Sequence, residues 1–315
     1  MTSTHSQEAR FRRLAGAELV AETRADFLFF LFRTLRTVAP GVRYQPNWHM
    51  DAMAEYLAAA ARGDITRLII NLPPRMLKST MVSVAWPAWL LGHNPTMRLM
   101  AASYAQSLAT KHSVDCRAVM QSRWYRRAFP ETRLSGEQNE KDKFATTQRG
   151  YRIATSVGGA ATGEGGHILI VDDPINPLQA SQYAARHAVN QWFDHTFATR
   201  LDDKRHGAIV LVMQRLHKED LSGYLLERDG WEHLNLPAIA PERTVIALGH
   251  YRHVRAAGTA LHPMREDLKL LERTKRELGN ANFSAQYQQQ PLSAEGALVK
   301  PLWFPRFDLE TFTGA

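Results

Sequence analysis

The sequence is poor in cysteine and lacks a long apolar run, and each absence excludes a class of protein. Cys116 is the only cysteine among 315 residues, which excludes an intrachain disulfide and a cysteine-rich zinc or iron–sulfur site. No apolar stretch follows the first ten residues directly, as a secretory signal would require. The longest apolar candidate, residues 81–92, is too short for a bilayer and contains Pro87. We therefore expect a soluble, cytoplasmic protein without a membrane partner.

Positive charge, by contrast, is in excess. Lysine and arginine total 39 against 31 aspartates and glutamates, which gives a formal net charge of +8. A basic balance of this size permits a polyanionic partner without establishing one. The chain is 44% apolar, and at this length it can bury a substantial core in one large domain with appendages.

Short apolar runs alternate with helical patterns along most of the chain. Strands are predicted at residues 67–72, 97–103, 167–174, 207–214 and 231–239. Helices are predicted at residues 27–35, 46–62, 104–122, 218–228 and 265–279, and one more begins near Lys78 and is bent or shortened by Pro87. Strands that alternate with helices indicate an α/β fold with a mostly parallel sheet.

Two segments depart from this alternation. Residues 144–147 and 151–157 flank a short turn and predict a hairpin. Residues 240–263 are rich in proline, glycine and histidine and have no apolar periodicity, so we expect irregular structure there.

The first candidate for chemistry is the junction between the strand at 67–72 and the next helix. Such a junction directs free backbone N–H groups and the helix dipole at one point, where an anion binds. A lysine there can reach terminal phosphate oxygens, and the next hydroxyl can ligate Mg²⁺. Leu72 and Leu77 replace the two glycines of the usual phosphate-loop pattern. The alternative is a polar helix N-terminus capped by Ser79. The candidate loop comprises Pro74, Arg75, Met76, Leu77, Lys78, Ser79 and Thr80.

Two adjacent carboxylates form the second candidate. Asp172 and Asp173 end the apolar run at 167–174, and acids at the end of a buried strand are costly unless they serve a metal or a water. In a nucleotide hydrolase the first holds Mg²⁺ through water, and the second orients or deprotonates the attacking water. The alternative is an acidic turn, since Asp-Asp-Pro favours turns. Together with Lys78 upstream, the pair favours a nucleotide site.

A polar residue also ends the strand at 207–214. Gln214 can sense the γ-phosphate from the tip of a neighbouring strand and pass its loss onward. A glutamine that simply ends a strand fits the same spacing equally well.

These motifs, in their order, resemble the ATPase part of the large terminase subunit of tailed phages and prophages. The resemblance covers residues 44–290 and includes GDITRLIINLPPRMLKST, SYAQSLA, WYRRAFP, ATSVGGAATGEGGHILIVDDP and VMQRLHKEDLSG. It implies a RecA-like P-loop ATPase core of α/β class, with a mostly parallel sheet flanked by helices and a small C-terminal lid or linker region. It also implies a DNA-stimulated ATPase that uses Mg²⁺ and ATP to drive double-stranded DNA into a procapsid.

The resemblance also implies a division of the chain into four parts. These are a helical lead-in at 1–40, the ATPase core at 41–235, a lid or linker subdomain at 236–290, and the start of a linker at 291–315. In the family this linker leads to a nuclease of the RNase H type, which needs several separated carboxylates around two metals. The last part has three acids, so we expect no nuclease activity from this chain.

Roles follow residue by residue where the motifs match. Arg75 matches an arginine that precedes the lysine in the family's phosphate loop, and it supplies a second cation beside Lys78. Ser79 matches the hydroxyl that ligates Mg²⁺, and Asp172 matches the Mg²⁺-associated acid. Asp173 stands where many of these motors carry a catalytic glutamate.

Other matches are to regions rather than to single positions. Gln45 and His49 lie in the region that resembles the adenine-side motif. Gln214 lies in the coupling-motif region, where the family usually has serine or threonine. An arginine from one subunit completes the next subunit's site in this family, because a guanidinium stabilises spread phosphate charge. Arg149 and Arg152, from the predicted hairpin, are the candidates, and solvated hairpin arginines are the alternative.

The expected partners also come from the resemblance. They are double-stranded DNA, a homo-oligomeric ring on the portal and the terminase small subunit, in the host cytoplasm and on the procapsid during packaging. DNA would be held through its phosphates, because packaging tolerates any sequence. Two alternatives stay open. One is a helicase-like P-loop ATPase, and the other is a prophage remnant or DNA-binding protein without ATPase activity.

Overall fold

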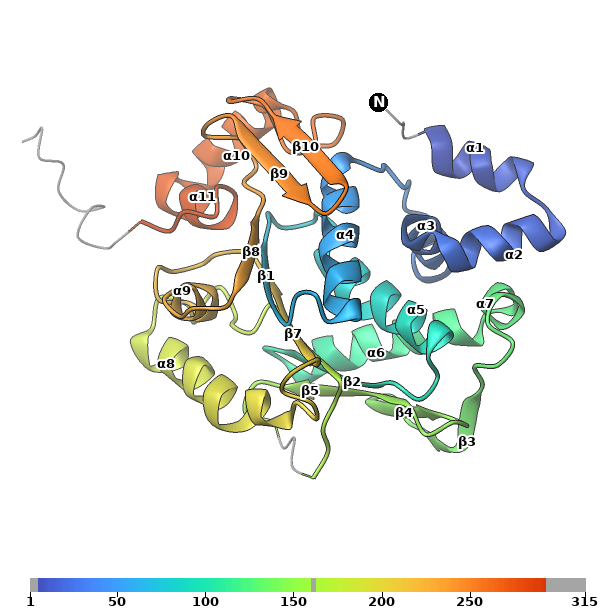
Figure 1. Ribbon diagram of the computed structural model, residues 1–315. Helices are drawn as coiled ribbons and strands as arrows, with labels where there is room; N and C mark the ends of the chain where they lie inside the picture. The colour runs from blue at the N-terminus through green and yellow to red at the C-terminus, as the bar shows by residue number, and fades with distance from the viewer. Residues whose placement is uncertain (1–4, 160–162, 293–315) are drawn as a thin grey trace, which may run out of the picture.

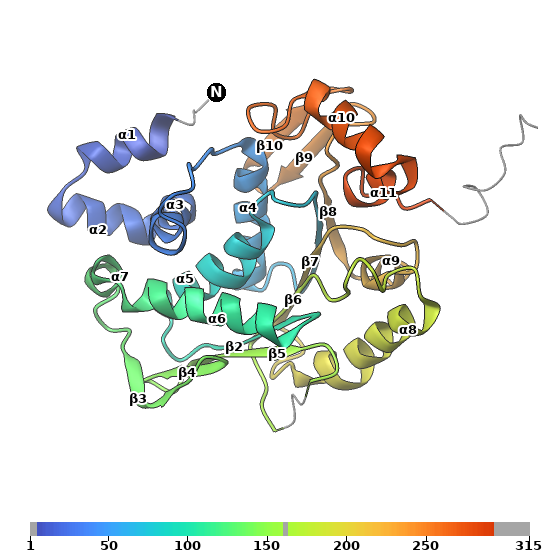
Figure 2. The ribbon, with the colours of Figure 1, turned by 180° about the vertical axis from the view of Figure 1, so that it is seen from behind.

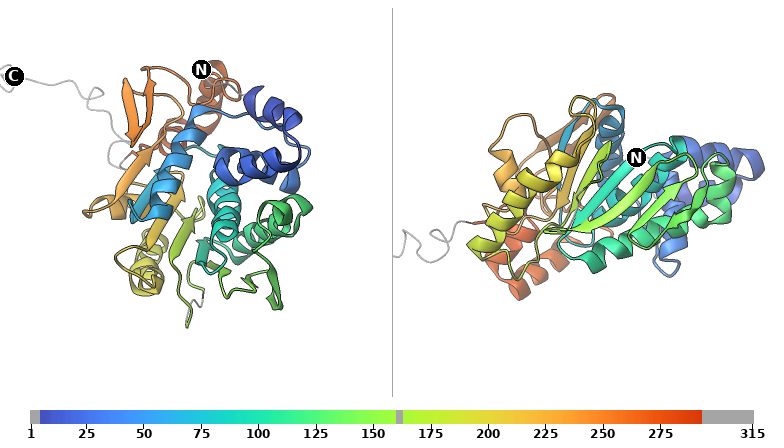
Figure 3. Two further views of the ribbon diagram at one scale, coloured as in Figure 1. Left: turned by 45° about the vertical axis from the view of Figure 1, so that its right-hand side comes forward. Right: turned by 90° about the horizontal axis from the view of Figure 1, so that it is seen from below.

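A twisted eight-stranded sheet lies at the centre of the protein (Figures 1 and 3). The structure is a computed structural model that describes residues 5–159 and 163–292. The strands are β1 (Arg67–Asn71), β2 (Arg98–Ser103), β3 (Leu134–Asn139), β4 (Lys143–Thr146), β5 (Tyr151–Ser156), β6 (Ile168–Asp172), β7 (Ala208–Met213) and β8 (Glu232–Asn235). Their order across the sheet is β3-β4-β5-β2-β6-β7-β1-β8.

Every neighbouring pair along the order β5-β2-β6-β7-β1-β8 is parallel, whereas the pairs β3–β4 and β4–β5 are antiparallel, so β4 runs against the other strands. Strands β6 and β7 are buried at every position, which explains why both read as continuous apolar runs rather than alternating ones. The α/β class, the mostly parallel sheet and the hairpin of β4 and β5 are confirmed.

Helices cover both faces of the sheet (Figures 1 and 2). One face packs against α3 (Phe27–Val38), α4 (Trp48–Arg62), η1 (Thr80–Ala85), α5 (Trp86–His93), α6 (Gln106–Gln121) and α7 (Arg123–Ala128). The other face packs against α8 (Tyr183–Trp192), η2 (Phe193–Phe197) and α9 (Leu221–Leu226), and the short η3 (Ala198–Arg200) follows η2. Successive residues of the central strands enter the two cores alternately, as in Ile69 and Ile70 of β1.

Pro87 divides the helix that follows the candidate phosphate loop, as the sequence predicts. The first part, η1, is a π-helix, in which the N–H of Trp86 donates to the carbonyl of Met81. Helix α5 then begins with Pro87 in its first turn. Because η1 leads into α5 without a break, Pro87 also removes an N–H donor that the carbonyl of the preceding turn would otherwise have in α-helical register.

An N-terminal helical layer lies beside this core (Figure 1). Helices α1 (His5–Arg13) and α2 (Gly16–Ala25) lead into α3, which begins where Asp26 accepts hydrogen bonds from the N–H groups of Leu28 and Phe29. Helix α3 is apolar nearly all round and is buried at most positions, as expected for a helix packed on a body.

The C-terminal segment corrects one expectation. Residues 240–263 are not irregular throughout, because β9 (Thr244–Leu248) and β10 (Tyr251–Arg255) form an antiparallel pair. The pair contributes few side chains to the core, so its sequence has no apolar alternation. Helices α10 (Leu268–Leu278) and α11 (Asn280–Gln286) follow. Within the described residues, no helix is both long and apolar enough to cross a bilayer.

Candidate active site

The candidate phosphate loop connects the end of β1 to η1 and has an unusual backbone. Arg75 and Leu77 both have a φ of 63°, in the left-handed region that glycine adopts freely and other residues adopt at a cost of about 1 kcal/mol or more. Leu77 stands at the second glycine position of the usual pattern, so the loop takes up a glycine-like conformation without glycine. Residues of this kind cluster at functional sites, where the surrounding structure holds them in place.

Lys78 lies at the meeting point of three elements. Its side chain is buried, and its Nζ is 3.0 Å from Oδ2 of Asp173 at the end of β6. The same Nζ donates to Oε1 of Gln214, just beyond β7, at 3.3 Å. All three residues lie at the carboxyl edge of the parallel strands, where open α/β sheets bind their ligands. The structure thus brings together three residues that the sequence separates widely.

Asp172 is the buried acid of the pair. Its Oδ1 accepts from the Ser79 hydroxyl at 2.9 Å, and its Oδ2 accepts from the Ser83 hydroxyl at 2.7 Å. Burial raises the pKa of Asp172, and Lys78 and the two serine hydrogen bonds act against the rise. His112 of α6 lies on the other side, with Nδ1 at 3.5 Å from Oδ2. The Ser79 hydroxyl and the Asp172 carboxylate therefore lie together beside Lys78.

Asp173 differs from Asp172 in exposure and backbone. Its side chain is 25% exposed, against 1% for Asp172, so a water molecule can approach it. Its φ is 46°, and its N–H donates to the carbonyl of Val212 while its carbonyl accepts from the N–H of Tyr104. These bonds to β7 and to the residue after β2 hold a strained backbone that aims the carboxylate at Lys78.

The donor set of the site fits Mg²⁺ better than a metal held by protein ligands alone. No cluster of three or more histidines, cysteines or acids lies close enough together to hold a metal in residues 5–159 and 163–292. Mg²⁺ commonly takes one or two protein oxygens and completes its shell with water and phosphate. Ser79 Oγ and the Asp172 carboxylate supply oxygens of that kind, next to a cation suited to phosphate.

A small hollow beside the loop gathers the other predicted residues. Gln45, His49, Arg75, Met76 and Leu77 line it, together with Leu35, Val42, Arg43, Tyr44, Met50, His262 and Arg265. His49 is fully buried and accepts from Asn47 Nδ2 at 2.6 Å through Nδ1. Burial lowers the pKa of His49 to about 3, so the ring is neutral at pH 7. Arg75 is exposed at the rim.

The two candidate trans-acting arginines occupy different environments. Arg149 is exposed in the turn between β4 and β5, at the edge of the sheet opposite Lys78. Arg152 has 0% exposure and donates through Nη2 to the carbonyl of Ser83 at 3.0 Å. A guanidinium without exposed surface is not available to a neighbouring subunit in this conformation, and of the two arginines only Arg149 is exposed.

Several buried polar residues beneath the site have no motif of their own. Asn71 ends β1, and its Oδ1 accepts from Ser222 Oγ at 2.7 Å and lies 2.8 Å from His233 Nε2. Ser83 follows Ser79 by one helical turn, a spacing that puts two hydroxyls on one face and could have indicated it. No local pattern distinguishes His112, which reaches Asp172 only through the packing of α6 on β5.

A further network joins the site to the C-terminal helices. Arg215, next to Gln214, donates through Nε to both oxygens of the buried Asp220. The backbone N–H of Arg215 donates to Oε1 of Gln289, beyond α11, at 2.9 Å. Gln289 is buried and has a φ of 57°. The segment that bears Gln214 is thus tied to the end of the described chain.

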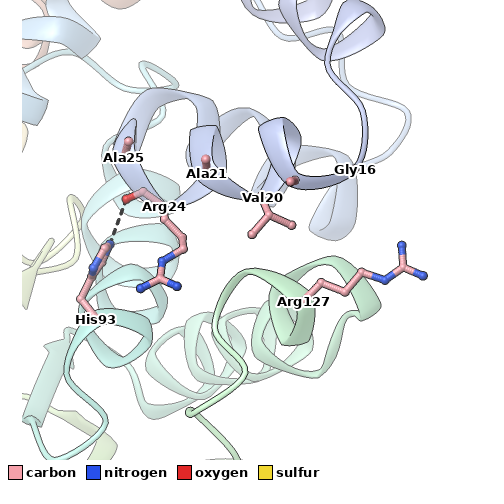
Figure 4. A pocket seen from close by; sticks show the side chains of 8 residues that line it. Gly16, Val20, Ala21, Arg24, Ala25, His93 and Arg127 are labelled. Atoms are coloured by element: carbon pink, nitrogen blue, oxygen red, sulfur yellow. Dashed lines mark hydrogen bonds between the residues drawn. The ribbon is translucent and has the colours of Figure 1, made fainter.

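Two other hollows have side chains that are less suited to binding a nucleotide with Mg²⁺. One lies along α2 and is lined by small residues together with Arg24, His93 and Arg127 (Figure 4). Within it, His93 Nε2 donates to the carbonyl of Arg24 at 3.0 Å. It contains no carboxylate and lies on the N-terminal helical layer, away from Lys78. A second hollow, between α8 and α9, mixes acids, histidines and tyrosines.

Comparison with known proteins identifies the fold. No protein-family model and no curated protein matches the sequence. Among solved structures, the ATPase domain of the Thermus phage P74-26 large terminase, in a mutant form, has a TM-score of 0.54 and 11% identity. The match covers 84% of this chain and 98% of that domain. The RecA-like α/β fold of phage large-terminase ATPase domains is therefore that of this chain.

Two other large-terminase structures are matched over about half of their length or less. One from a thermophilic bacteriophage, in complex with ADP, has a TM-score of 0.43 and 12% identity, over 82% of this chain and 52% of that one. The large terminase of bacteriophage HK97 has a TM-score of 0.39 and 12% identity, over 66% and 44%.

Proposed function

We propose that this chain, which has the fold of a phage large-terminase ATPase domain, hydrolyses Mg²⁺-ATP to drive double-stranded DNA into a procapsid. One observation carries the proposal. Lys78, Ser79, Asp172, Asp173 and Gln214 come from three separate segments and meet at the carboxyl edge of the sheet. Nucleotide hydrolases use a buried lysine to bind phosphate, and a hydroxyl and two acids beside it to bind Mg²⁺ and orient the attacking water.

Lys78 and the loop hold the phosphates in this proposal. The Lys78 ammonium leaves Asp173 and Gln214 for the β- and γ-phosphate oxygens, and N–H groups of the loop bind the same oxygens. Arg75, exposed at the rim, adds a second cation. Ser79 Oγ and the Asp172 carboxylate would hold Mg²⁺, directly and through its waters, and the bound ion would supply positive charge against the charge that develops on the phosphates.

Asp173 acts on the water. Released from Lys78, its carboxylate orients a water in line with the γ-phosphorus and takes a proton as the new P–O bond forms. The bond between the γ-phosphorus and the β–γ bridging oxygen breaks, which leaves ADP and phosphate. Gln214 accepts a hydrogen bond from Lys78, and in this proposal it senses through that lysine whether the γ-phosphate is present. Gln45, at the hollow beside the loop, contacts the base, and the buried His49 packs behind it and shapes that side of the hollow.

The remaining partners are proposed from the same fold. The chain acts in a homo-oligomeric ring on the portal, in the host cytoplasm, with a terminase small subunit. Lysines and arginines, which give the chain a net charge of +8, grip DNA through the phosphates. Arg149, exposed at the far edge of the sheet, supplies the arginine that completes a neighbouring subunit's site.

The test compares Lys78→Ala with the wild-type chain. ATP binding is measured by calorimetry, and hydrolysis by phosphate release with and without linear double-stranded DNA. We expect the variant to lose hydrolysis and to bind ATP much more weakly. Strand separation coupled to hydrolysis would favour the helicase alternative. Equal behaviour of both proteins, without binding, would leave a remnant or a DNA-binding protein.

A further inference from the structure

Arg152 is an unusual residue, because it is a fully buried cation that no acid neutralises directly. It lies on β5 opposite Leu99 of β2, on the face of the sheet that η1 and α6 cover. Its Nε and Nη1 have no hydrogen-bond partner, and no carboxylate of the described residues forms an ion pair with it. Burying a charge with so few partners costs folding free energy, so a favourable interaction is needed to offset this cost.

The one hydrogen bond that the Arg152 side chain makes to the described residues supplies that interaction. Its Nη2 donates to the carbonyl of Ser83 at 3.0 Å. Ser83 lies near the end of the π-helical η1, just before the α-helical register of α5 begins. In that α-helical register its donor would be the N–H of residue 87, which is a proline and has none. The guanidinium thus takes the place of a backbone donor that the sequence removes.

The same turn carries the contacts to the Mg²⁺-associated acid. Ser83 is 1% exposed, and its hydroxyl donates to Oδ2 of Asp172, while Ser79 donates to Oδ1. The Ser83 residue therefore joins Arg152, through its carbonyl, to Asp172, through its hydroxyl. Arg152 also lowers the pKa of Asp172 by its charge, although burial is the larger effect and raises it.

We propose that Arg152 is a positioning residue of its own subunit's ATP site: it replaces the donor missing at Pro87 and so holds the Ser79–Ser83 turn against Asp172. This inference rests on the proposed function, because it assigns Asp172 and Ser79 to Mg²⁺. It differs from a trans-acting role, in which the guanidinium would reach another subunit's phosphate.

The first test measures how the binding of a fluorescent ATP analogue depends on Mg²⁺ concentration. For Arg152→Gln we expect the Mg²⁺ concentration at half-saturation to rise by about tenfold or more, as for other residues that orient metal ligands. Arg152→Lys keeps the charge and one donor, and should lie between this variant and wild type. Arg62→Gln, an exposed arginine at the end of α4, is the matched control and should behave as wild type.

The second test uses Pro87→Ala, which restores an N–H four residues after Ser83. In the Arg152→Gln background it should recover both the melting temperature and much of the Mg²⁺ dependence, while in the wild-type background it should change little. If Arg152→Gln does not fold alone, the same pair of comparisons is made with Arg152→Lys. An unchanged Mg²⁺ dependence in the Arg152 variants, or the absence of any rescue by Pro87→Ala, would overturn the inference.

The two tests also separate the inference from the proposed function. The melting-temperature comparison needs no nucleotide, so it reports on the coupling of Arg152 and Pro87 even if the chain does not bind ATP. Absence of nucleotide binding by the wild-type chain would refute the proposed function, and with it the role of Arg152 toward Mg²⁺.

Discussion

The left-handed backbone at Leu77 predicts that a glycine variant is more stable than an alanine variant at this position, which is the reverse of the usual order. In most positions glycine is less stable than alanine by about 0.5–1 kcal/mol, because it gains more freedom in the unfolded chain. At a φ of 63° alanine retains a left-handed strain of about 1–2 kcal/mol, which glycine does not have. Leu77→Gly should therefore be more stable than Leu77→Ala by about 0.5–1 kcal/mol.

The packing of the leucine side chain cancels in this comparison. Leu77 is half-buried against the core beside α3 and α4, and both variants lose its side-chain contacts, worth about 1 kcal/mol for partial burial. Relative to wild type, Leu77→Ala loses packing and keeps the strain. Leu77→Gly loses the same packing but relieves the strain, so it should lie close to wild type.

The assay is urea unfolding of the nucleotide-free chain, with the same pair of substitutions at Glu272 as the control. Glu272 is exposed inside α10, and there glycine should be the less stable by about 1 kcal/mol. ATP binding of Leu77→Gly is measured in parallel, and should be retained because glycine permits the same loop. If glycine were the less stable residue at both positions, the loop would not have the left-handed backbone on which the phosphate site depends.

Three further predictions concern the surroundings of the site. Because the pKa of His49 is lowered to about 3 from an ordinary value of 6.5, the unfolded chain binds a proton there that the folded chain does not; stability should fall as pH drops from 6.5 toward 3, by up to about 1.4 kcal/mol per pH unit. His49→Gln should flatten this slope in unfolding measured across that range, and an unaltered slope would show that His49 is not buried neutral. Gln289→Ala leaves the buried N–H of Arg215 without its acceptor and should cost about 1–3 kcal/mol by urea unfolding; a loss below 0.5 kcal/mol, roughly the error of such a comparison, would show that water replaces the amide. Ser83→Ala removes one hydrogen bond to Asp172 and should weaken Mg²⁺-dependent ATP binding by about tenfold in a Mg²⁺ titration, and an unchanged titration would separate Ser83 from the metal-binding turn.

Much of the sheet could be predicted because its strands are buried on both faces. Runs such as Leu68–Ile70 and Ile168–Val171 are apolar at every position, and nothing except a central parallel strand or a buried helix has this pattern at that length. The hairpin β9–β10 could not be predicted, since only one or two of its side chains reach the core. The apolar periodicity of a sequence reflects which side chains are buried, so a strand with few buried side chains has little apolar periodicity.

The positions of some residues of the candidate site could likewise be predicted from the sequence, and those of others could not. Lys78, Asp172 and Asp173 follow apolar runs directly, so parallel pairing alone predicts that they share one edge of the sheet. The proximity of Lys78 to Asp173 agrees with that expectation. The position of Arg152 could not be predicted, because its burial depends on how η1 and α6 cover β5. The sequence pattern of a hairpin does not indicate that one of its arginines is buried in the core.

The measurement that tests the account most directly is steady-state ATP hydrolysis by the purified chain, with and without linear double-stranded DNA, beside Asp173→Asn. We predict turnover that DNA stimulates and that the substitution removes, while ATP binding persists in the variant. Asparagine has the size of aspartate but cannot take the proton of the attacking water. Undiminished turnover in Asp173→Asn would contradict the role of the second acid, and failure of the wild-type chain to bind ATP would contradict the ATPase itself.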